Sequence, residues 1–296
     1  ESMDYIIDVN AKLGHKDDKT EFAENAHKTI DRRFEAFSHY LQQDDWDLFF
    51  GVFMTTDRVN HFLFKDYENG TSDREAFMEF YRKVDDYLGQ IREMLPDDVT
   101  LVVASDHGFT SLNYEVHCNA LLEQEGWLSY EDDDHEQLED ISDDTLAYSL
   151  IPGRFYLNLE GREPDGVVPE DEYDQRRDEL KEMLEGLEGP DGNKVAARVV
   201  EKEEAFRGDH DDIAPDLVVV PNHGFDLKSG FKGKDDVFGQ GPRNGMHSFD
   251  NASLYIDDPD ATIEDADLYD IAPTILDLME VEYSRTDFDG ASLVTQ

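Results

Sequence analysis

The sequence has few of the features that mark several common protein classes. It contains a single cysteine, Cys118, which excludes an intrachain disulfide and a cysteine-based zinc finger. Lys and Arg number 26 against 72 Asp and Glu, so basic charge is too scarce for a face that neutralises nucleic-acid phosphates. An anionic membrane surface would repel the chain as well. No apolar run reaches the roughly 20 residues of a membrane span, and no basic-then-apolar signal segment opens the sequence.

The apolar content nevertheless indicates a folded protein and not an acidic disordered chain. Hydrophobic residues make up 39% of the 296 residues and aromatic residues 11%, which is enough for a full core. The formal net charge of −46 then lies mainly on the surface, where self-repulsion destabilises the fold unless salt screens it. This composition resembles the acidic proteins of salt-accumulating halophiles. The alternatives are a calcium-buffering protein or an acidic interaction module, but no EF-hand is present because Arg285 occupies the first ligand position of the nearest match.

Hydrophobic periodicity predicts alternating helices and strands in the first third of the chain. Apolar residues recur every three or four positions over 19–43 and 73–95, which is typical of amphipathic helices. Short apolar runs over 47–54 and 99–104 instead favour buried strands. A strand, a long helical crossover and a second strand form a βαβ unit, so we expect the two strands to be parallel in one sheet.

The rest of the chain predicts one α/β core with a less regular insertion. Further strands are expected at 155–159, 195–200, 217–220 and 253–256, and helices at 172–187 and 267–279. The glycine-rich segment 224–245 and the acidic stretch 131–144 are predicted to be loops. We therefore expect a core formed by residues 1–118 and 214–296, and an inserted cap-like segment at 119–213.

Candidate metal ligands follow both strands of the predicted parallel pair, at the sheet edge where ligands bind. Asp57 and His61 come just after the first strand, and at i and i+4 of a helix they would share one face and could hold a metal ion. An adjacent carboxylate and imidazole, Asp106 and His107, come directly after the second strand. His247 precedes a later strand and would complete a set of two His and one carboxylate, typical of a catalytic metal with an open position.

Each of these patterns also has an ordinary structural interpretation. An Asp four residues before a His is common on helices, and the segment 106–108 could form a simple turn. Thr55 and Thr56 lie near the proposed metal, but no His or Lys base is placed to activate either hydroxyl. We therefore expect both threonines to be structural.

The order of the motifs resembles the alkaline phosphatase superfamily, and most closely its type I phosphodiesterase/nucleotide pyrophosphatase family. In that family an Asp-x-x-x-His pair, a Ser-Asp-His-Gly and a Gly-x-His follow one another, as they do here at 57–61, 105–108 and 245–247. Further similar segments are 158–164, 214–217 and 270–276. The resemblance implies a central, mostly parallel sheet with helices on both faces and an inserted subdomain, in a protein of halophilic archaeal type.

The same resemblance implies a site for two divalent metal ions. Asp57, His61 and His247 would bind one ion, and Asp106 and His107 would bind the second. Zinc is the usual metal of the family, and manganese occurs in some branches. The two ions would clamp a phosphoester, one stabilising the leaving oxygen and the other activating the nucleophile. The implied substrate is a small-molecule phosphoester or a nucleotide-like compound, and no particular oligomeric state is implied.

The beginning of the sequence departs from the family pattern. Family members open with a strand that ends in a metal-binding Asp and leads to a Thr or Ser nucleophile at a helix start, and no such helix follows the apolar run at 5–10. We therefore expect the C-terminal portion of a cytoplasmic enzyme, inactive alone, whose nucleophile lies N-terminal to this chain. The alternatives are a non-catalytic, metal-stabilised binding module and another superfamily chemistry, that of a sulfatase or a phosphoglycerate mutase.

Overall fold

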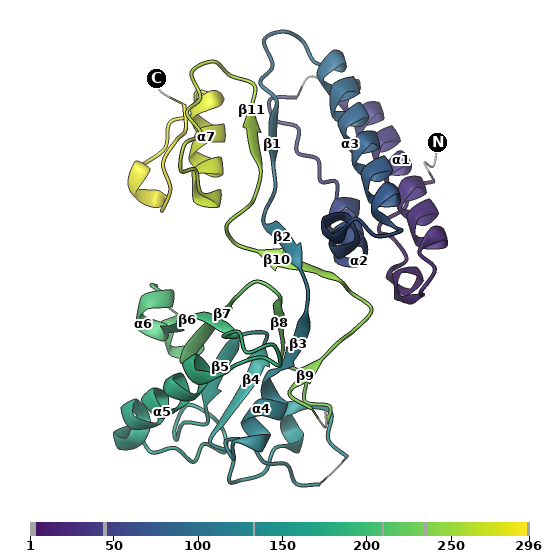
Figure 1. Cartoon of the computed structure of the whole chain (residues 1–296). Helices are drawn as coiled ribbons and strands as arrows, with labels where there is room; N and C mark the ends of the chain where they lie inside the picture. Colours follow the sequence, from purple (N-terminus) through teal and green to yellow (C-terminus); the bar gives the residue numbers. More distant parts are fainter. Residues whose placement is uncertain (1–3, 44–45, 133, 209, 234–235, 295–296) are drawn as a thin grey trace. The chain divides into compact units, whose positions relative to one another are not determined.

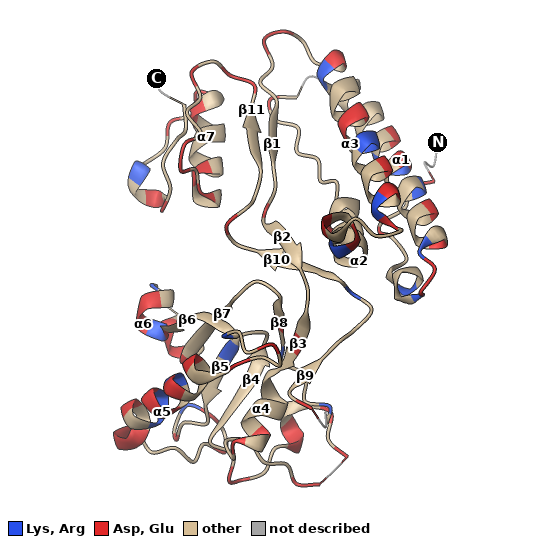
Figure 2. Ribbon diagram, in the orientation of Figure 1, with Lys and Arg blue, Asp and Glu red and all other residues tan. Residues whose placement is uncertain are grey.

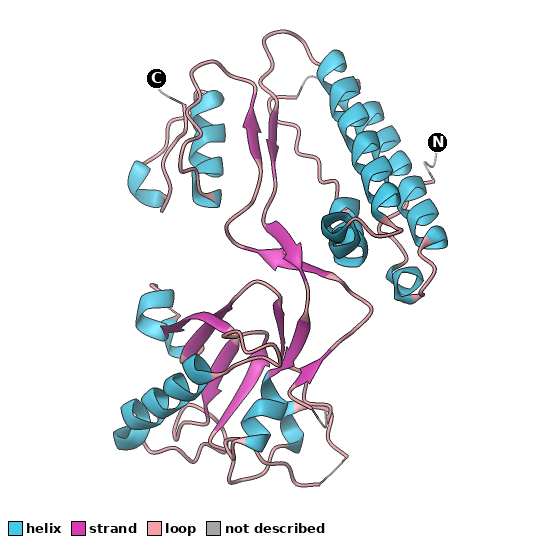
Figure 3. Ribbon diagram, viewed as in Figure 1, coloured by secondary structure: helices cyan, strands magenta, loops and turns pink. Residues whose placement is uncertain are grey.

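The computed structural model describes residues 4–43, 46–132, 134–208, 210–233 and 236–294. Within these ranges the chain forms helices and several small sheets, so the mixed α/β class expected from the sequence is confirmed (Figure 1, Figure 3). The chain divides into a first unit, Glu1–Ser111 with Pro242–Gln296, and a second unit, Leu112–Gly241. Each unit has its own buried apolar cluster.

Helices carry the apolar core of the first unit. α1 (Thr20–Leu41) and α3 (Arg74–Met94) confirm the two helices predicted from periodicity, and α2 (Thr55–Asn69) lies between them in the sequence. Gly70 caps the C-terminal end of α2, and its left-handed φ of 67° costs a glycine no steric strain. The buried side chains that pack together are Val9, Phe22, Ala26, Ile30, Val59, Phe62, Leu63, Phe77, Phe80 and Val84.

Short antiparallel strand pairs complete the part of the first unit that carries the predicted ligands. β1 (Val102–Ala104) pairs with β11 (Leu254–Ile256), and β2 (Gly108–Ser111) pairs with β10 (Gly245–Ser248). α2 packs against both β2 and β10, so His247 on β10 is brought close to the helix. The remaining elements of this unit are η1 (Ala11–His15), η5 (Leu268–Asp270), α7 (Ile271–Leu278) and η6 (Arg285–Asp287).

The strand predicted over 47–54 is not formed, and the parallel βαβ unit that depended on it is wrong. An apolar run becomes a strand only where a neighbouring strand pairs with its backbone, and no described strand pairs with this one. The carbonyl of Val52 instead accepts a hydrogen bond from the buried Arg33 at 2.9 Å. Leu48, Phe50 and Val52 are left exposed, Phe50 by 77%.

The second unit is built on two small sheets. Its elements are β3 (Tyr114–His117), α4 (Cys118–Gln124), η2 (Leu138–Asp140), β4 (Ala147–Ile151), β5 (Arg154–Leu157), η3 (Glu170–Glu172), α5 (Tyr173–Gly186), β6 (Ala196–Glu201), α6 (Lys202–Ala205), η4 (Asp211–Ile213), β7 (Leu217–Pro221), β8 (Phe225–Lys228) and β9 (Phe238–Gly239). One sheet has the order β4-β5-β7-β6 with antiparallel neighbours, and α5 packs against it. In the other, β3 pairs in parallel with β8 and antiparallel with β9.

A buried ion pair ties the second unit together. Asp216 is 0% exposed, and Arg162 donates to both of its carboxylate oxygens at 2.8 and 2.7 Å. The Tyr173 hydroxyl and the Leu157 backbone N–H each add a hydrogen bond of 2.7 Å to this carboxylate. A buried charge is tolerated when it is paired and its lone pairs are used in this way. Two of the sequence segments that carry the family resemblance therefore meet in a structural contact.

The unit boundaries differ from the predicted domain boundaries. The predicted insertion, 119–213, lies within the second unit. β3, β7 and β8 fall in the range expected for the core, but they belong to the second unit too. The segment 224–245, predicted to be a loop, contains β8 and β9. The central, mostly parallel sheet remains a prediction from the family resemblance, since β3 and β8 are the only parallel neighbours among the described strands.

Acidic residues are spread along the chain in both units, and Lys and Arg are fewer (Figure 2). α1, α3 and α5 each carry acidic residues on the helix face that points away from the core. In the part of the chain that the structure describes, no helix combines the length and the apolar character needed to cross a membrane.

Candidate metal centre

The first turns of α2 carry two of the predicted ligands on one face. Asp57 lies in the first turn and His61 one turn later, and Asp57 Oδ1 is 3.5 Å from His61 Nε2. His61 is buried, whereas the Asp57 carboxylate keeps partial access to solvent. A helix places residues i and i+4 one above the other, which explains why the spacing could predict this contact.

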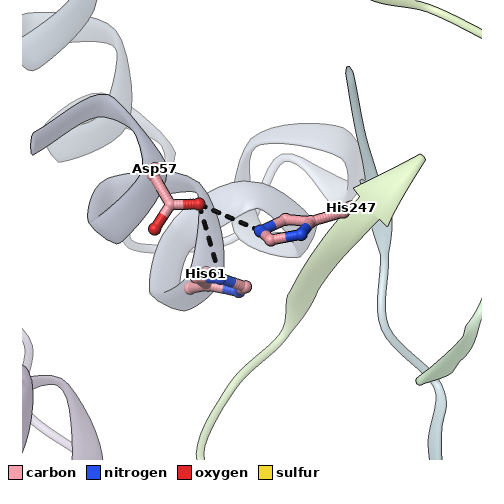
Figure 4. A group of neighbouring side chains, drawn as sticks. All are labelled: Asp57, His61 and His247. Atoms are coloured by element: carbon pink, nitrogen blue, oxygen red, sulfur yellow. Dashed lines mark hydrogen bonds and ion pairs between the residues drawn. The ribbon is translucent and has the colours of Figure 1, made fainter. Parts of the chain in front are cut away.

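β10 brings His247 to the same place from a position 190 residues after Asp57. His247 Nε2 is 3.0 Å from Asp57 Oδ1, and the ring centroids of His61 and His247 are 4.9 Å apart. One ligand atom from each of the three residues lies within 4.8 Å of the other two. Figure 4 shows the three side chains converging, with both imidazoles linked to the same carboxylate oxygen. We call Asp57, His61 and His247 the α2–β10 cluster.

The close approach of α2 and β10 depends on Gly245. Its carbonyl accepts a hydrogen bond from His61 Nδ1 at 3.0 Å, so Nδ1 carries the proton and Nε2 is the free nitrogen that faces Asp57. The Asn244 backbone N–H donates to the His61 carbonyl at 2.8 Å. A Cβ at position 245 would lie only 2.2 Å from the Asn60 carbonyl oxygen. A glycine is therefore needed here for space between two backbones.

The second predicted pair, Asp106 and His107, lies between β1 and β2. The His107 ring stacks on that of His247 with centroids 3.8 Å apart. His107 Nε2 is 3.9 Å from Asp57 Oδ1 and 3.6 Å from Asp106 Oδ1, and the Asp106 side chain is 82% exposed. The structure thus brings His107 against the α2–β10 cluster and leaves Asp106 at the solvent side of His107.

Local electrostatics favour the protonation states that bind metals. Burial, the largest influence on the Asp57 pKa, tends to raise it, but the hydrogen bond from His247 and the electrostatic influence of His61, His247 and Arg58 outweigh burial and lower the pKa. Burial lowers the pKa of His61 in spite of its hydrogen bond to Gly245. A metal requires a carboxylate and a neutral imidazole, and both shifts favour these forms at neutral pH.

The donor set of the α2–β10 cluster fits a divalent transition metal. Two imidazole nitrogens and one carboxylate oxygen are a common three-ligand set for zinc, and they leave one position open for a further ligand. Manganese accepts the same nitrogen and oxygen donors.

The two threonines that begin α2 have different surroundings. Thr56 Oγ1 donates to the Phe53 carbonyl at 2.8 Å, a bond at the first turn of the helix. Thr55 is buried with 1% of its surface exposed. The Thr55 hydroxyl has no hydrogen-bond partner among the described residues, and the structural role expected of both threonines stays a prediction.

Arg58 and Asp8 lie beside the cluster and were not identified from the sequence. Arg58 Nη1 donates to Asp57 Oδ2 at 3.0 Å, while its Nε and Nη2 donate to Asp8 Oδ2 at 3.1 and 2.8 Å. The only signal in the sequence is an arginine next to a candidate ligand and an aspartate in the apolar run at 5–10. Nothing in the spacing links two residues that are 50 positions apart.

Comparison with known proteins gave one family match. The family model described as type I phosphodiesterase / nucleotide pyrophosphatase matches residues 3–250, a range that includes the α2–β10 cluster, Asp106 and His107. No curated protein and no solved structure matched the chain in the corresponding searches.

Proposed function

This chain belongs to the type I phosphodiesterase/nucleotide pyrophosphatase family, and from that premise we propose that it is a metal-dependent phosphoester hydrolase acting on a small phosphodiester or nucleotide-like substrate. Membership in a phosphoesterase family supports the reaction class. The observation that carries the metal dependence is the α2–β10 cluster, in which two imidazoles and a carboxylate each place a ligand atom within 4.8 Å of the others.

Each residue has a definite role in this proposal. Asp57, His61 and His247 hold one divalent ion, and Asp106 and His107 contribute to a second. When bound, such ions stabilise charge on phosphoryl oxygens and activate a nucleophile. The protein's part is to hold the donors in place: the Gly245 carbonyl keeps the proton on His61 Nδ1 and leaves Nε2 available.

Metal content measured in high salt tests the assignment. We expect the wild-type protein to bind Zn²⁺ or Mn²⁺, and His61→Ala and His247→Ala to lose the ion. His39→Ala is a suitable control, because His39 is exposed on α1 and lies outside the cluster. A wild-type protein that binds neither metal, or cluster variants with unchanged metal content, would show that the site is wrongly assigned.

We further propose that neither threonine at the start of α2 is the nucleophile, because Thr55 is buried and the Thr56 hydroxyl donates to a backbone carbonyl. Any hydrolysis of a chromogenic bis-phosphoester by the chain saturated with metal should then be the same in Thr55→Val and Thr56→Val as in the wild type. Rapid hydrolysis that is lost in Thr55→Val or Thr56→Val would contradict this point and identify the nucleophile.

One observation favours a second candidate function, a non-catalytic module stabilised by metal. The α2–β10 cluster joins positions 190 residues apart, so an ion bound there would cross-link distant parts of the first unit and stabilise its fold. Removal of the metal with a chelator would then lower the unfolding temperature, and the metal-loaded protein would show no esterase activity at all. Metal-dependent hydrolysis would instead favour the enzyme.

A further inference from the structure

The two carboxylate oxygens of Asp57 have different neighbours. Oδ1 faces the imidazoles, at 3.0 Å from His247 Nε2 and 3.5 Å from His61 Nε2. Oδ2 points the other way and accepts a hydrogen bond from Arg58 Nη1 at 3.0 Å. Only Oδ1 is therefore directed at the position where an ion would bind, and the carboxylate would coordinate it through one oxygen.

The guanidinium of Arg58 is shared between two carboxylates. One edge, Nε and Nη2, binds Asp8 Oδ2 at 3.1 and 2.8 Å, and the remaining Nη1 reaches Asp57. A guanidinium is planar and its donors have fixed directions, so holding one edge on Asp8 fixes the direction of the Nη1 donor. Without Asp8 the same group could turn its two-donor edge to Asp57 and occupy both oxygens.

Asp8 itself is held by several contacts. Its Oδ1 accepts a hydrogen bond from the Val9 N–H at 2.7 Å, and Val9 is buried in the helical core. The buried Arg33 of α1 donates to the Ile7 carbonyl at 2.6 Å, just before Asp8 in the chain. Asp8 is thus attached to the core of the first unit and can serve as a fixed support for Arg58.

We propose that Arg58 and Asp8 are positioning residues for the metal centre: Arg58 orients Asp57 so that Oδ1 faces the two histidines, and Asp8 holds Arg58 so that it cannot occupy that oxygen. This inference rests on the metal site proposed above. Groups that hydrogen-bond to a ligating carboxylate typically change metal affinity by about 10–100-fold when they are removed.

Calorimetric titration with Mn²⁺ in molar KCl tests the proposal. High salt screens the charge of Arg58, so a change in affinity reports mainly on the orientation of Asp57. We expect Arg58→Ala to weaken Mn²⁺ binding about 10–100-fold. Arg58→Lys should restore little of this affinity, because an ammonium group lacks the planar, fixed arrangement of N–H donors of a guanidinium. Arg82→Ala is the matched control, since Arg82 pairs with Glu75 on the exposed surface of α3.

A double substitution separates positioning from a general loss of stability. Asp8→Ala should weaken Mn²⁺ binding while Arg58 is present, because the freed guanidinium then competes for Asp57. In an Arg58→Ala background Asp8→Ala should have no further effect, so the two changes are not additive. If Arg58→Ala does not fold, the Mn²⁺ affinities of Arg58→Lys and Asp8→Ala can still be compared with that of the wild type. Thermal unfolding of the metal-free proteins shows whether each variant is folded.

The outcomes distinguish this inference from the proposed function. If His61→Ala abolishes Mn²⁺ binding while the Arg58 and Asp8 variants bind like the wild type, the positioning role is wrong and the metal site stands. Tighter binding by Arg58→Ala would also overturn the role, because it would mean that Arg58 acts as a repelling charge. If the wild type binds no metal, the proposed function itself fails.

Discussion

His61 and Gly245 are joined by a hydrogen bond of 3.0 Å from the imidazole Nδ1 to the backbone carbonyl, and this bond fixes α2 against β10. It links the helix that carries Asp57 and His61 to the strand that carries His247. The geometry of the α2–β10 cluster therefore depends on a contact that involves no side chain of the strand.

Gly245→Ala should disrupt the cluster. A methyl group at this position would meet the Asn60 carbonyl at 2.2 Å, so α2 and β10 must separate. We expect a loss of about 1–3 kcal/mol in the free energy of unfolding, as for other overpacked sites, and weaker Zn²⁺ or Mn²⁺ binding by calorimetry. Gly89→Ala is the control: Gly89 lies in α3 with open space around it, and this change should stabilise the helix by about 0.5–1 kcal/mol. Equal metal affinity in Gly245→Ala and the wild type would contradict the role of this close approach.

The thiol of Cys118 should report on the stability of the second unit. Cys118 is 1% exposed, and burial raises its pKa to about 11, so both access and thiolate formation are suppressed in the folded protein. With a net charge of −46, the chain should lose structure when ionic strength falls. We expect slow labelling by a disulfide reagent in molar salt and fast labelling in dilute buffer. Slow labelling in both conditions, with an unchanged circular dichroism spectrum, would show that the fold does not need salt.

The ion pair of Arg162 and Asp216 should be sensitive to removal of one partner. Arg162→Leu leaves the buried Asp216 carboxylate without its charged donor, and we expect a loss of about 3–5 kcal/mol in stability, measured by denaturant titration with Cys118 labelling as the readout. Replacing both residues by leucine should cost less than the single change. A double variant that is less stable than Arg162→Leu would mean that the pair itself, and not the unpaired charge, decides the stability.

His27 should give the first unit a pH-dependent stability. Burial lowers its pKa, the nearby Lys83 lowers it further, and Nδ1 has no hydrogen-bond partner among the described residues. The unfolded chain binds a proton on His27 at about pH 6.5, whereas the folded chain binds it only at lower pH. The contribution of His27 to the free energy of unfolding is therefore fully present above about pH 6.5. It is lost as the pH falls through this value toward the pKa of the folded state. In His27→Leu the slope of unfolding free energy against pH between about 5 and 6.5 should be smaller. The same slope in His27→Leu and in the wild type would contradict this assignment.

The sequence predicts the helices better than the strands, for a physical reason. α1 and α3 are recognised because one helix presents a complete apolar face, so the signal is local. A strand also depends on its neighbour: the apolar runs at 47–54 and 99–104 look alike, yet only the second contains a paired strand, β1 with β11. The local sequence does not predict which of the two apolar runs pairs with another strand.

In the candidate site, too, residues in recognisable motifs could be predicted, whereas contacts between distant segments could not. Asp57 and His61 follow from helical spacing, and His247 could be added because its motif occurs in the order of the family. The contact of Arg58 with Asp8 could not be predicted, since Asp8 lies in a separate segment and has no motif of its own. The Gly-x-His motif includes Gly245, but the reason for a glycine there is not visible in the sequence, because it arises from the position of the Asn60 carbonyl.

The exposed run at Leu48, Phe50 and Val52 has a consequence for how the protein behaves in concentrated solution. A segment with alternate exposed apolar side chains and no strand partner among the described residues can pair with the same segment of another molecule and start aggregation. Repulsion between highly acidic molecules opposes such encounters, but the salt that relieves charge repulsion within one molecule weakens repulsion between molecules as well. Folding stability and colloidal stability should therefore respond to salt in opposite directions, and the useful working range is an intermediate ionic strength.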